Sequence, residues 1–135
     1  MDDGFLTPDP NRLEALAGSG DGPVVMVNLI RFRDQATEPC EGMTDAEAYG
    51  RYSAETIPHL ERVGARIISA VACQDPVIGP ETREWDMTIL VEYPSPTAFL
   101  EMVSDPGYLE THQFRIAALE DSRLIPSRAV PAPGD

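Results

Sequence analysis

Apolar residues along the chain follow the two patterns that β-strands produce. Residues 24–33 form a nearly continuous apolar run rich in β-branched side chains, which is typical of a strand buried on both faces. Residues 84–93 alternate instead, with Trp85 and every second residue up to Tyr93 facing one way and the residues between them facing the other. Shorter runs at 65–73 and 122–125 predict two further strands, so four strands are expected.

Helical spacing separates these strands at two places. Thr44 and Glu47 have the spacing of a capping box, in which both side chains satisfy free backbone N–H groups at a helix start. An apolar stripe with helical spacing follows, and Gly64 is well placed to end this helix. A Ser-Pro pair at 95–96 starts a second helical region, which residues 105–107 interrupt and residues 108–119 continue.

The predicted order is therefore strand, helix, strand, strand, helix, strand. This βαββαβ order is the ferredoxin-like arrangement of the α+β class, in which a four-stranded antiparallel sheet carries its helices on one face. The doubly apolar first strand predicts that the opposite face of the sheet is apolar as well. Because burial of apolar surface is worth ~25 cal/mol per Å², pairing with a second copy is favourable, and a homodimer is expected.

The 135 residues suit one domain with appended ends. Residues 1–23 are rich in proline and glycine and are interpreted as an N-terminal arm with a short helix at 11–17. Their glycine cluster precedes a strand, whereas a dinucleotide-binding loop follows one, so we interpret it as a turn. The predicted domain spans 24–126, and 127–135 are expected to form a flexible tail.

The charged residues of the chain argue against several kinds of partner and reaction. The chain has 10 basic and 23 acidic side chains and a formal net charge of −13, so it repels phosphate backbones and anionic lipid headgroups. We therefore expect neither nucleic acid nor membrane as a partner. Every basic residue is an arginine. Without lysine, the chain can form neither a lysine Schiff base nor a phosphate loop ending in Gly-Lys.

Cysteine and histidine spacing argues against a metal site. Cys40 and Cys73 form no Cys-x-x-Cys pair, and two free thiols in a reducing cytosol are expected. His59 and His112 lack the spacing that places two metal ligands on one helix face. The acidic start at residues 1–4 differs from the basic start of a signal peptide, so we expect a cytoplasmic protein.

Four short strings occur in order along the chain. They are Val-Asn-Leu-Ile-Arg-Phe at 27–32; Tyr49-x-x-Tyr52 with Pro58 and Gly64-Ala65-Arg66; Val91-Glu92-Tyr93-Pro94-Ser95 with Ala98-Phe99; and Asp105-Pro106-x-Tyr108 with Arg115. Together they resemble the bacterial domain of unknown function numbered 1330, within the dimeric α/β-barrel superfamily, over roughly residues 24 to 126.

The resemblance implies a ferredoxin-like protomer whose sheet closes into a barrel with that of a second copy. It implies no established reaction. Other members of the superfamily include cofactor-free monooxygenases of polyketide tailoring, muconolactone isomerases and haem-binding proteins similar to chlorite dismutase. These proteins place ligands between the sheet and the helices, although fold alone carries little functional weight.

Asn28, His112 and Arg115 are candidate ligand-binding residues. Asn28 shares a strand face with apolar residues, so its amide either faces a ligand or bonds a neighbouring loop. His112 and Arg115 are three residues apart on one side of a helix, where a guanidinium could hold an anion and a neutral imidazole could move a proton. The alternative is an exposed helix face on which Arg115 pairs with an acid such as Glu110 or Glu120.

Tyr52, Trp85 and Ser122 complete the candidate set. Tyr52 either lines a pocket or packs in the core, and Trp85 either stacks on a flat ligand or serves as a core or interface residue. Ser122 could reach a pocket edge, but no Gly-x-Ser-x-Gly elbow marks it as a nucleophile. Asp86 is expected to form a structural pair with an arginine across the sheet, either Arg31 or Arg66.

The leading hypothesis is a protein that binds a small oxygen-rich or anionic organic molecule. As an enzyme it would need neither metal nor cofactor and would act on an enolizable substrate, in the manner of a monooxygenase or an isomerase. Asn28 and Arg115 would then hold oxygens, and His112 or Tyr52 would relay protons. The alternative is a non-catalytic ligand-binding or dimerisation module.

Overall fold

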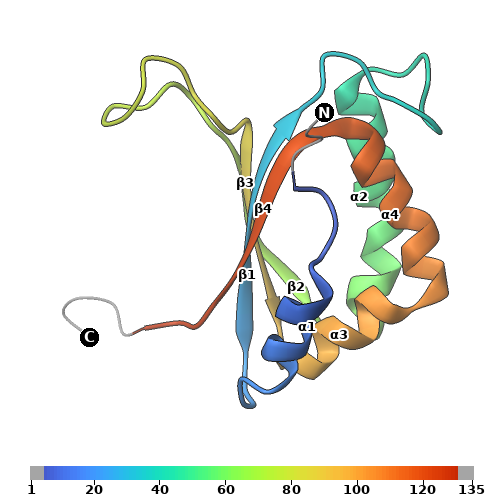
Figure 1. Cartoon of the computed structure of the whole chain (residues 1–135), viewed down its shortest axis with the longest axis vertical. Helices are drawn as coiled ribbons and strands as arrows, with labels where there is room; N and C mark the ends of the chain where they lie inside the picture. The colour runs from blue at the N-terminus through green and yellow to red at the C-terminus, as the bar shows by residue number, and fades with distance from the viewer. Residues whose placement is uncertain (1–4, 131–135) are drawn as a thin grey trace.

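A four-stranded antiparallel sheet with its helices on one face forms the framework of the molecule (Figure 1). The computed structural model describes residues 5–130. In chain order the elements are α1 (Pro10–Ala17), β1 (Val24–Phe32), α2 (Asp45–Arg62), β2 (Arg66–Ala72), β3 (Met87–Tyr93), α3 (Pro96–Ser104), α4 (Pro106–Ala118) and β4 (Leu119–Ser127). The strand order β2-β3-β1-β4 confirms the predicted ferredoxin-like α+β arrangement.

Local capping signals start α2 and α3 where the sequence predicts, whereas α1 begins at Pro10 and α4 at Pro106, one and two residues earlier than predicted. Thr44 and Glu47 form both hydrogen bonds of the capping box, each at 3.1 Å, and α2 begins at the next residue after Thr44. Gly64 follows the end of α2 with a φ of +78°, a conformation that glycine adopts without steric cost. The Asp105 side chain accepts the Tyr108 N–H, so the break between α3 and α4 is also a helix cap.

One side of the sheet forms the core with the helices. Val24, Met26 and Ile30 of β1 are almost completely buried against them, as are Ile89 and Val91 of β3. This is the alternation predicted for β3. The strand β4 is longer than the predicted 122–125, because it pairs with β1 along nearly its whole length.

The opposite side of the sheet is apolar, and none of the described helices covers it (Figure 1). Val27 and Leu29 lie at its centre and are half-buried. Val71 of β2 and Ile125 of β4 lie on the same side and are 52% and 46% exposed. The molecule therefore has an apolar sheet face that a single copy leaves in contact with water.

The described part of the N-terminal arm packs on the domain. The helix α1 lies against α3, and Leu6, Leu13 and Leu16 are partly buried against the core. Arg128 Nη1 donates to the carbonyls of residues 21–23 at 2.9 Å, which joins the end of β4 to the start of β1. Residues 1–4 and 131–135, parts of the expected arm and tail, lie outside the described residues.

None of the helices in residues 5–130 combines the length and the apolar character needed to cross a bilayer.

Candidate functional site

A cavity of about 1280 Å³ lies between the sheet and the helices, with the N-terminal arm along one side. Five of the six predicted site residues line it: Asn28 from β1, Tyr52 from α2, His112 and Arg115 from α4, and Ser122 from β4. Its volume lies above the ~300–1,000 Å³ that is usual for small-molecule sites. The structure thus brings together side chains from four elements that are distant in sequence.

A chain of hydrogen bonds runs along the helical wall of this cavity. The hydroxyl oxygens of Tyr52 and Tyr108 are 2.9 Å apart, and the Tyr108 hydroxyl is 3.4 Å from His112 Nδ1. Tyr108 and His112 are four residues apart on α4, so they are neighbours on one face of the helix. Tyr108 was not among the predicted site residues, although the sequence places it a further turn back along the same helix face as His112 and Arg115.

Tyr108 and His112 are uncharged at neutral pH. Burial, together with the Arg115 cation, lowers the pKa of His112 from 6.5 to about 4, although the Leu6 carbonyl partly opposes this shift. Burial, reinforced by Tyr52, raises the pKa of Tyr108 well above its usual value of 10. His112 Nε2 is buried and has no hydrogen-bond partner among residues 5–130. A neutral imidazole therefore keeps one ring nitrogen uncommitted beside the cavity.

Arg115 is inside the protein and not on an exposed helix face, so the alternative interpretation of this residue is wrong. It is only 6% exposed, and its Nη1 donates to the Leu6 carbonyl at 3.3 Å. The acids proposed as partners are elsewhere: Glu110 is exposed, and Glu120 lies 3.9 Å from Arg31. No acid within the described part of the chain forms an ion pair with Arg115.

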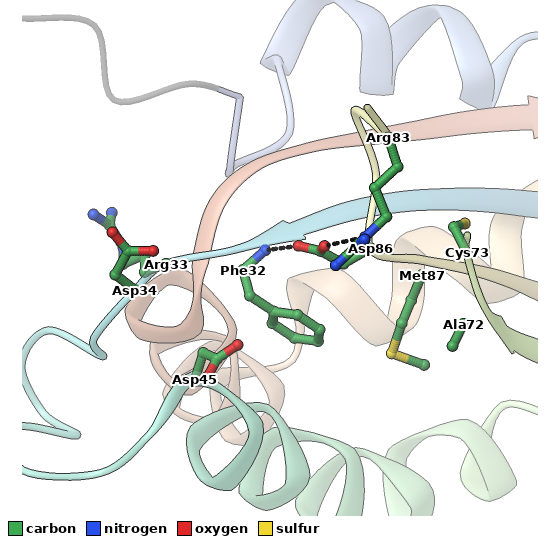
Figure 2. Close-up of a pocket in the computed structure, with 9 residues that line it drawn as sticks. All are labelled: Phe32, Arg33, Asp34, Asp45, Ala72, Cys73, Arg83, Asp86 and Met87. Carbon is green, nitrogen blue, oxygen red and sulfur yellow. Dashed lines mark hydrogen bonds and ion pairs between the residues drawn. The ribbon is translucent and has the colours of Figure 1, made fainter. Parts of the chain in front are cut away.

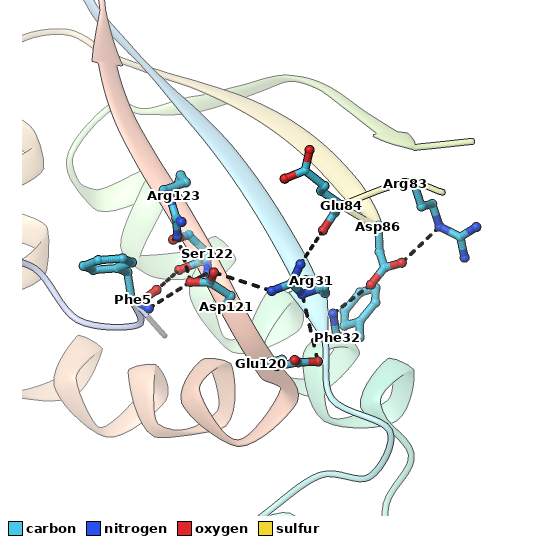
Figure 3. A network of polar contacts seen from close by, with 10 residues as sticks. All are labelled: Phe5, Arg31, Phe32, Arg83, Glu84, Asp86, Glu120, Asp121, Ser122 and Arg123. Atoms are coloured by element: carbon cyan, nitrogen blue, oxygen red, sulfur yellow. Dashed lines mark hydrogen bonds and ion pairs between the residues drawn. The ribbon is translucent and has the colours of Figure 1, made fainter. Parts of the chain in front are cut away.

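Asn28 and Ser122 line the cavity but also form structural hydrogen bonds. Asn28 Nδ2 donates to the Ile89 carbonyl of β3 at 3.4 Å, so its structural partner is a strand and not a loop. This bond is long for an amide donor, and the amide remains at the cavity wall. The Ser122 hydroxyl donates to the Phe5 carbonyl and thereby attaches the N-terminal arm to β4 (Figure 3).

Trp85 does not line the cavity. The strand β3 begins only at Met87, so the alternation that places Ile89 and Val91 does not extend to Trp85. The Trp85 ring lies instead 5.6 Å from the Arg31 guanidinium and 5.1 Å from that of Arg123, at cation–π distances. Trp85 therefore contacts two arginines and lies outside the cavity that the other candidate residues line.

The expected pairing of Asp86 with Arg31 or Arg66 is wrong. Asp86 accepts the Phe32 N–H at 2.8 Å and pairs with Arg83 at 3.1 Å, three residues away along the same loop (Figures 2 and 3). Arg66 pairs with Glu92 at 3.0 Å. Sequence alternation predicted only the side of the strand on which Asp86 lies. It could not show that Arg83, in the preceding loop, would pair with the Asp86 carboxylate.

A second, smaller cleft lies beside the ends of β1 and β3 (Figure 2). It has a volume of about 550 Å³, and the Asp86 carboxylate at its edge is already bound by Arg83 and Phe32 N–H. Cys73 Sγ lies 3.4 Å from the Thr88 hydroxyl. Within residues 5–130 there is also no cluster of three or more His, Cys, Asp or Glu side chains able to hold a metal ion. The larger cavity is therefore the stronger candidate site.

Comparison with known proteins gives the class and the family. A solved structure of a cofactor-independent oxygenase, SnoaB from Streptomyces nogalater, is 15% identical, covers 84% of this chain and 99% of its own, and has a TM-score of 0.57. A dimeric protein of unknown function with a ferredoxin-like fold, from Bacteroides fragilis, is 10% identical over 80% of this chain and 97% of its own, with a TM-score of 0.52. At these identities the likeness shows the fold alone, which is ferredoxin-like.

The chain matches the family model described as Domain of unknown function (DUF1330) over residues 41–127, and it belongs to this family. Its first strand precedes the matched segment. RPA0582, a protein of unknown function from Rhodopseudomonas palustris, is 37% identical, with coverage of 96% of this chain and 99% of its own and a TM-score of 0.88. A search of the curated proteins found no match.

Proposed function

We propose that this protein binds a small organic anion in the cavity between its sheet and helices. The observation that supports this most directly is Arg115, a buried guanidinium without an acidic partner among the described residues. An unpaired buried cation is costly, and a bound anion would offset this cost. Asn28, Tyr52 and His112 line the same cavity and supply further polar contacts.

The chemistry that these groups favour is proton transfer on an enolizable substrate. Arg115 and Asn28 would hold the oxygens of the enolate, and His112 would accept the proton from carbon. In the free protein Arg115 lowers the pKa of His112, and a bound anion would oppose that effect and make the imidazole a stronger base. The Tyr52 and Tyr108 hydroxyls give the proton a path along the helical wall.

Return of the proton at another carbon would make the reaction an isomerisation, with no cofactor. The fold likeness to a cofactor-independent oxygenase supports a second version, in which the enolate reacts with dioxygen as a co-substrate. The alternative function is a non-catalytic ligand-binding or dimerisation module. The structural hydrogen bonds of Asn28 and Ser122 favour that alternative, because both side chains already have protein partners.

We also propose that the working unit is a homodimer formed through the apolar sheet face. The exposure of Val71 and Ile125 supports this, as does the dimeric Bacteroides fragilis protein of the same fold. A reducing cytoplasm is the proposed location, because Cys40 and Cys73 are both free thiols. Nucleic acid and anionic membranes are not proposed as partners, given the net charge of −13.

Thermal shift with small carbonyl acids, lactones and quinols tests the binding proposal. We expect carboxylates to raise the melting temperature of the wild-type protein and of the surface control Arg62→Ala, and to have no effect on Arg115→Ala. Any compound that is turned over is then tested with His112→Ala, with His59→Ala as the control. An equal shift in wild-type protein and Arg115→Ala would refute the proposal, and unchanged turnover in His112→Ala would remove that residue from the mechanism.

A further inference from the structure

The N-terminal arm places a backbone carbonyl on the cationic end of the cavity. The Leu6 oxygen accepts the one hydrogen bond that the Arg115 guanidinium forms with the described residues, at 3.3 Å. Leu6, Arg115 and His112 all line the same cavity. The Leu6 carbonyl therefore occupies a position on the guanidinium at which the oxygen of a bound anion would be held.

A carboxylate is a better partner for this guanidinium than the Leu6 carbonyl is. A guanidinium has five N–H donors in a fork, and a carboxylate can accept two of them side by side. A carboxylate also adds the Coulomb attraction between two opposite charges, which a neutral carbonyl does not supply. The observed contact is single, uses a neutral acceptor and lies at the long end of the range.

Near Leu6, the arm is attached to β4 by contacts of one residue, Phe5. The Phe5 N–H donates to Asp121 Oδ1 at 2.9 Å, the Phe5 carbonyl accepts from the Ser122 hydroxyl, and the Phe5 ring lies 4.7 Å from the Arg123 guanidinium (Figure 3). These contacts attach the arm through Phe5, and the Leu6 side chain is itself partly buried against the core. Thr7 and Pro8, which lead from Leu6 to α1, are exposed.

We propose that residues 5–9 act as an internal competitor, whose Leu6 carbonyl is displaced from Arg115 when a monocarboxylate with an apolar body enters the cavity. The apolar body would contact the side chains that face the same space, among them Leu13, Leu16, Met26 and Phe99. This inference rests on the proposed binding of an anion at Arg115, and it adds the class of ligand and the part of the protein that must move.

Hydrogen–deuterium exchange of the full-length protein tests the displacement directly. The probes are 4-phenylbutyrate and decanoate, with their uncharged amides as controls. Each carboxylate is expected to increase exchange in the peptide that contains residues 5–9, because the Phe5 N–H loses its acceptor, while exchange in β1 does not increase. Reduced or unchanged exchange in the arm peptide, at a carboxylate concentration that saturates Arg115, would overturn the inference.

Affinity measurements with a matched pair of variants give the second test. Asp121→Ala removes the acceptor of the Phe5 N–H, whereas Glu120→Ala removes the neighbouring acid; both acids contact Arg31, but only Asp121 bonds the described part of the arm. Loss of one competing hydrogen bond should tighten carboxylate binding about three- to tenfold in Asp121→Ala and leave it unchanged in Glu120→Ala. Unchanged or weaker binding by a folded Asp121→Ala protein would show that the arm is a fixed wall.

The experiments distinguish failure of the binding proposal from failure of the displacement proposal. If 4-phenylbutyrate binds equally well to wild-type protein and to Arg115→Gln, the anion site itself is wrong. If binding depends on Arg115 but the arm neither exchanges faster nor competes, only the displacement is wrong.

Discussion

The hydroxyl groups of Tyr52 and Tyr108 meet at 2.9 Å and connect α2 to α4 at the wall of the cavity. Tyr108 is 6% exposed, whereas Tyr52 is half-buried, so the bond joins a buried phenol to one nearer the solvent. Because the Tyr108 hydroxyl also approaches His112, the pair forms a path by which a proton could reach the imidazole from the cavity edge.

Removal of the Tyr52 hydroxyl should destabilise the protein more than removal of a hydroxyl without such a bond. We expect Tyr52→Phe to lower the free energy of unfolding by about 0.5–1.5 kcal/mol, the usual net contribution of one hydrogen bond. Tyr49→Phe is the control, since Tyr49 lies on the same helix and its hydroxyl has no hydrogen bond within the described residues. Urea unfolding measures both variants, and equal losses would contradict a specific role for this bond.

Acid should destabilise the protein through His112. The pKa of this imidazole is about 4 in the folded protein and 6.5 in an unfolded chain, so the unfolded state binds more protons between these values. Its contribution is therefore complete above pH 6.5 and is lost as the pH falls toward 4. At 1.36 kcal/mol per pKa unit the loss is at most about 3 kcal/mol, and solvent screening of a partly exposed group reduces it.

Urea unfolding between pH 7 and pH 4 measures this loss. His112→Gln should have a flatter profile than the wild-type protein over this range. Asp121 contributes to the pH dependence of stability at a lower pH than His112 does. Burial acts to raise its pKa, but hydrogen bonds from Phe5 N–H, Arg123 and Ser122 N–H outweigh burial and lower it, so its contribution is lost only in stronger acid. A wild-type profile that is flat above pH 4 would contradict the assignment to His112.

Replacement of Arg115 by an apolar residue should increase stability while it removes anion binding. Methionine has a similar length and no charge to desolvate, so we expect Arg115→Met to raise the free energy of unfolding by about 1–2 kcal/mol. The control Arg62→Met changes an arginine that is exposed and should have little effect. A large loss of stability in Arg115→Met would mean that the guanidinium is a structural group and not one held for a ligand.

A charge on the apolar sheet face should weaken the dimer. Ile125 and Leu109 are 46% and 54% exposed, but Ile125 lies on the uncovered side of the sheet and Leu109 on α4. We expect Ile125→Asp to raise the dimer dissociation constant at least about tenfold, because an unpaired carboxylate would be buried in the interface, and Leu109→Asp to leave it unchanged. Sedimentation equilibrium measures both, and a monomeric wild-type protein at micromolar concentration would remove the dimer proposal.

The sequence predicted the order of the elements because their signals are local. The Thr44 and Glu47 capping box, the alternation within β3 and the helix break near Asp105 each depend on a few neighbouring residues. The structure has the first two where expected, and the break is Asp105 alone and not the predicted 105–107. The length of β4 was underestimated because pairing with β1 and not local composition determines where it begins and ends.

The surroundings of the site residues were harder to predict, because they depend on segments distant in sequence. Helical spacing placed His112 and Arg115 on one side of α4 but could not show whether that side faces solvent or the cavity. The partner of Arg115 is a backbone carbonyl more than one hundred residues away, in an arm that seemed to lie outside the domain. Trp85 was misplaced because the alternation was extended past the start of β3.

The contacts of Arg128 separate the N-terminal arm from the sheet. Its guanidinium holds the carbonyls of residues 21–23 and lies next to the last residue of β4, so the chain is clamped immediately before β1 begins. A movement of the arm must therefore take place in residues before Asp21. The Arg128 contacts separate those residues from β1, so the register of the strands is not changed. The sheet can therefore remain rigid while residues 5–9 change position.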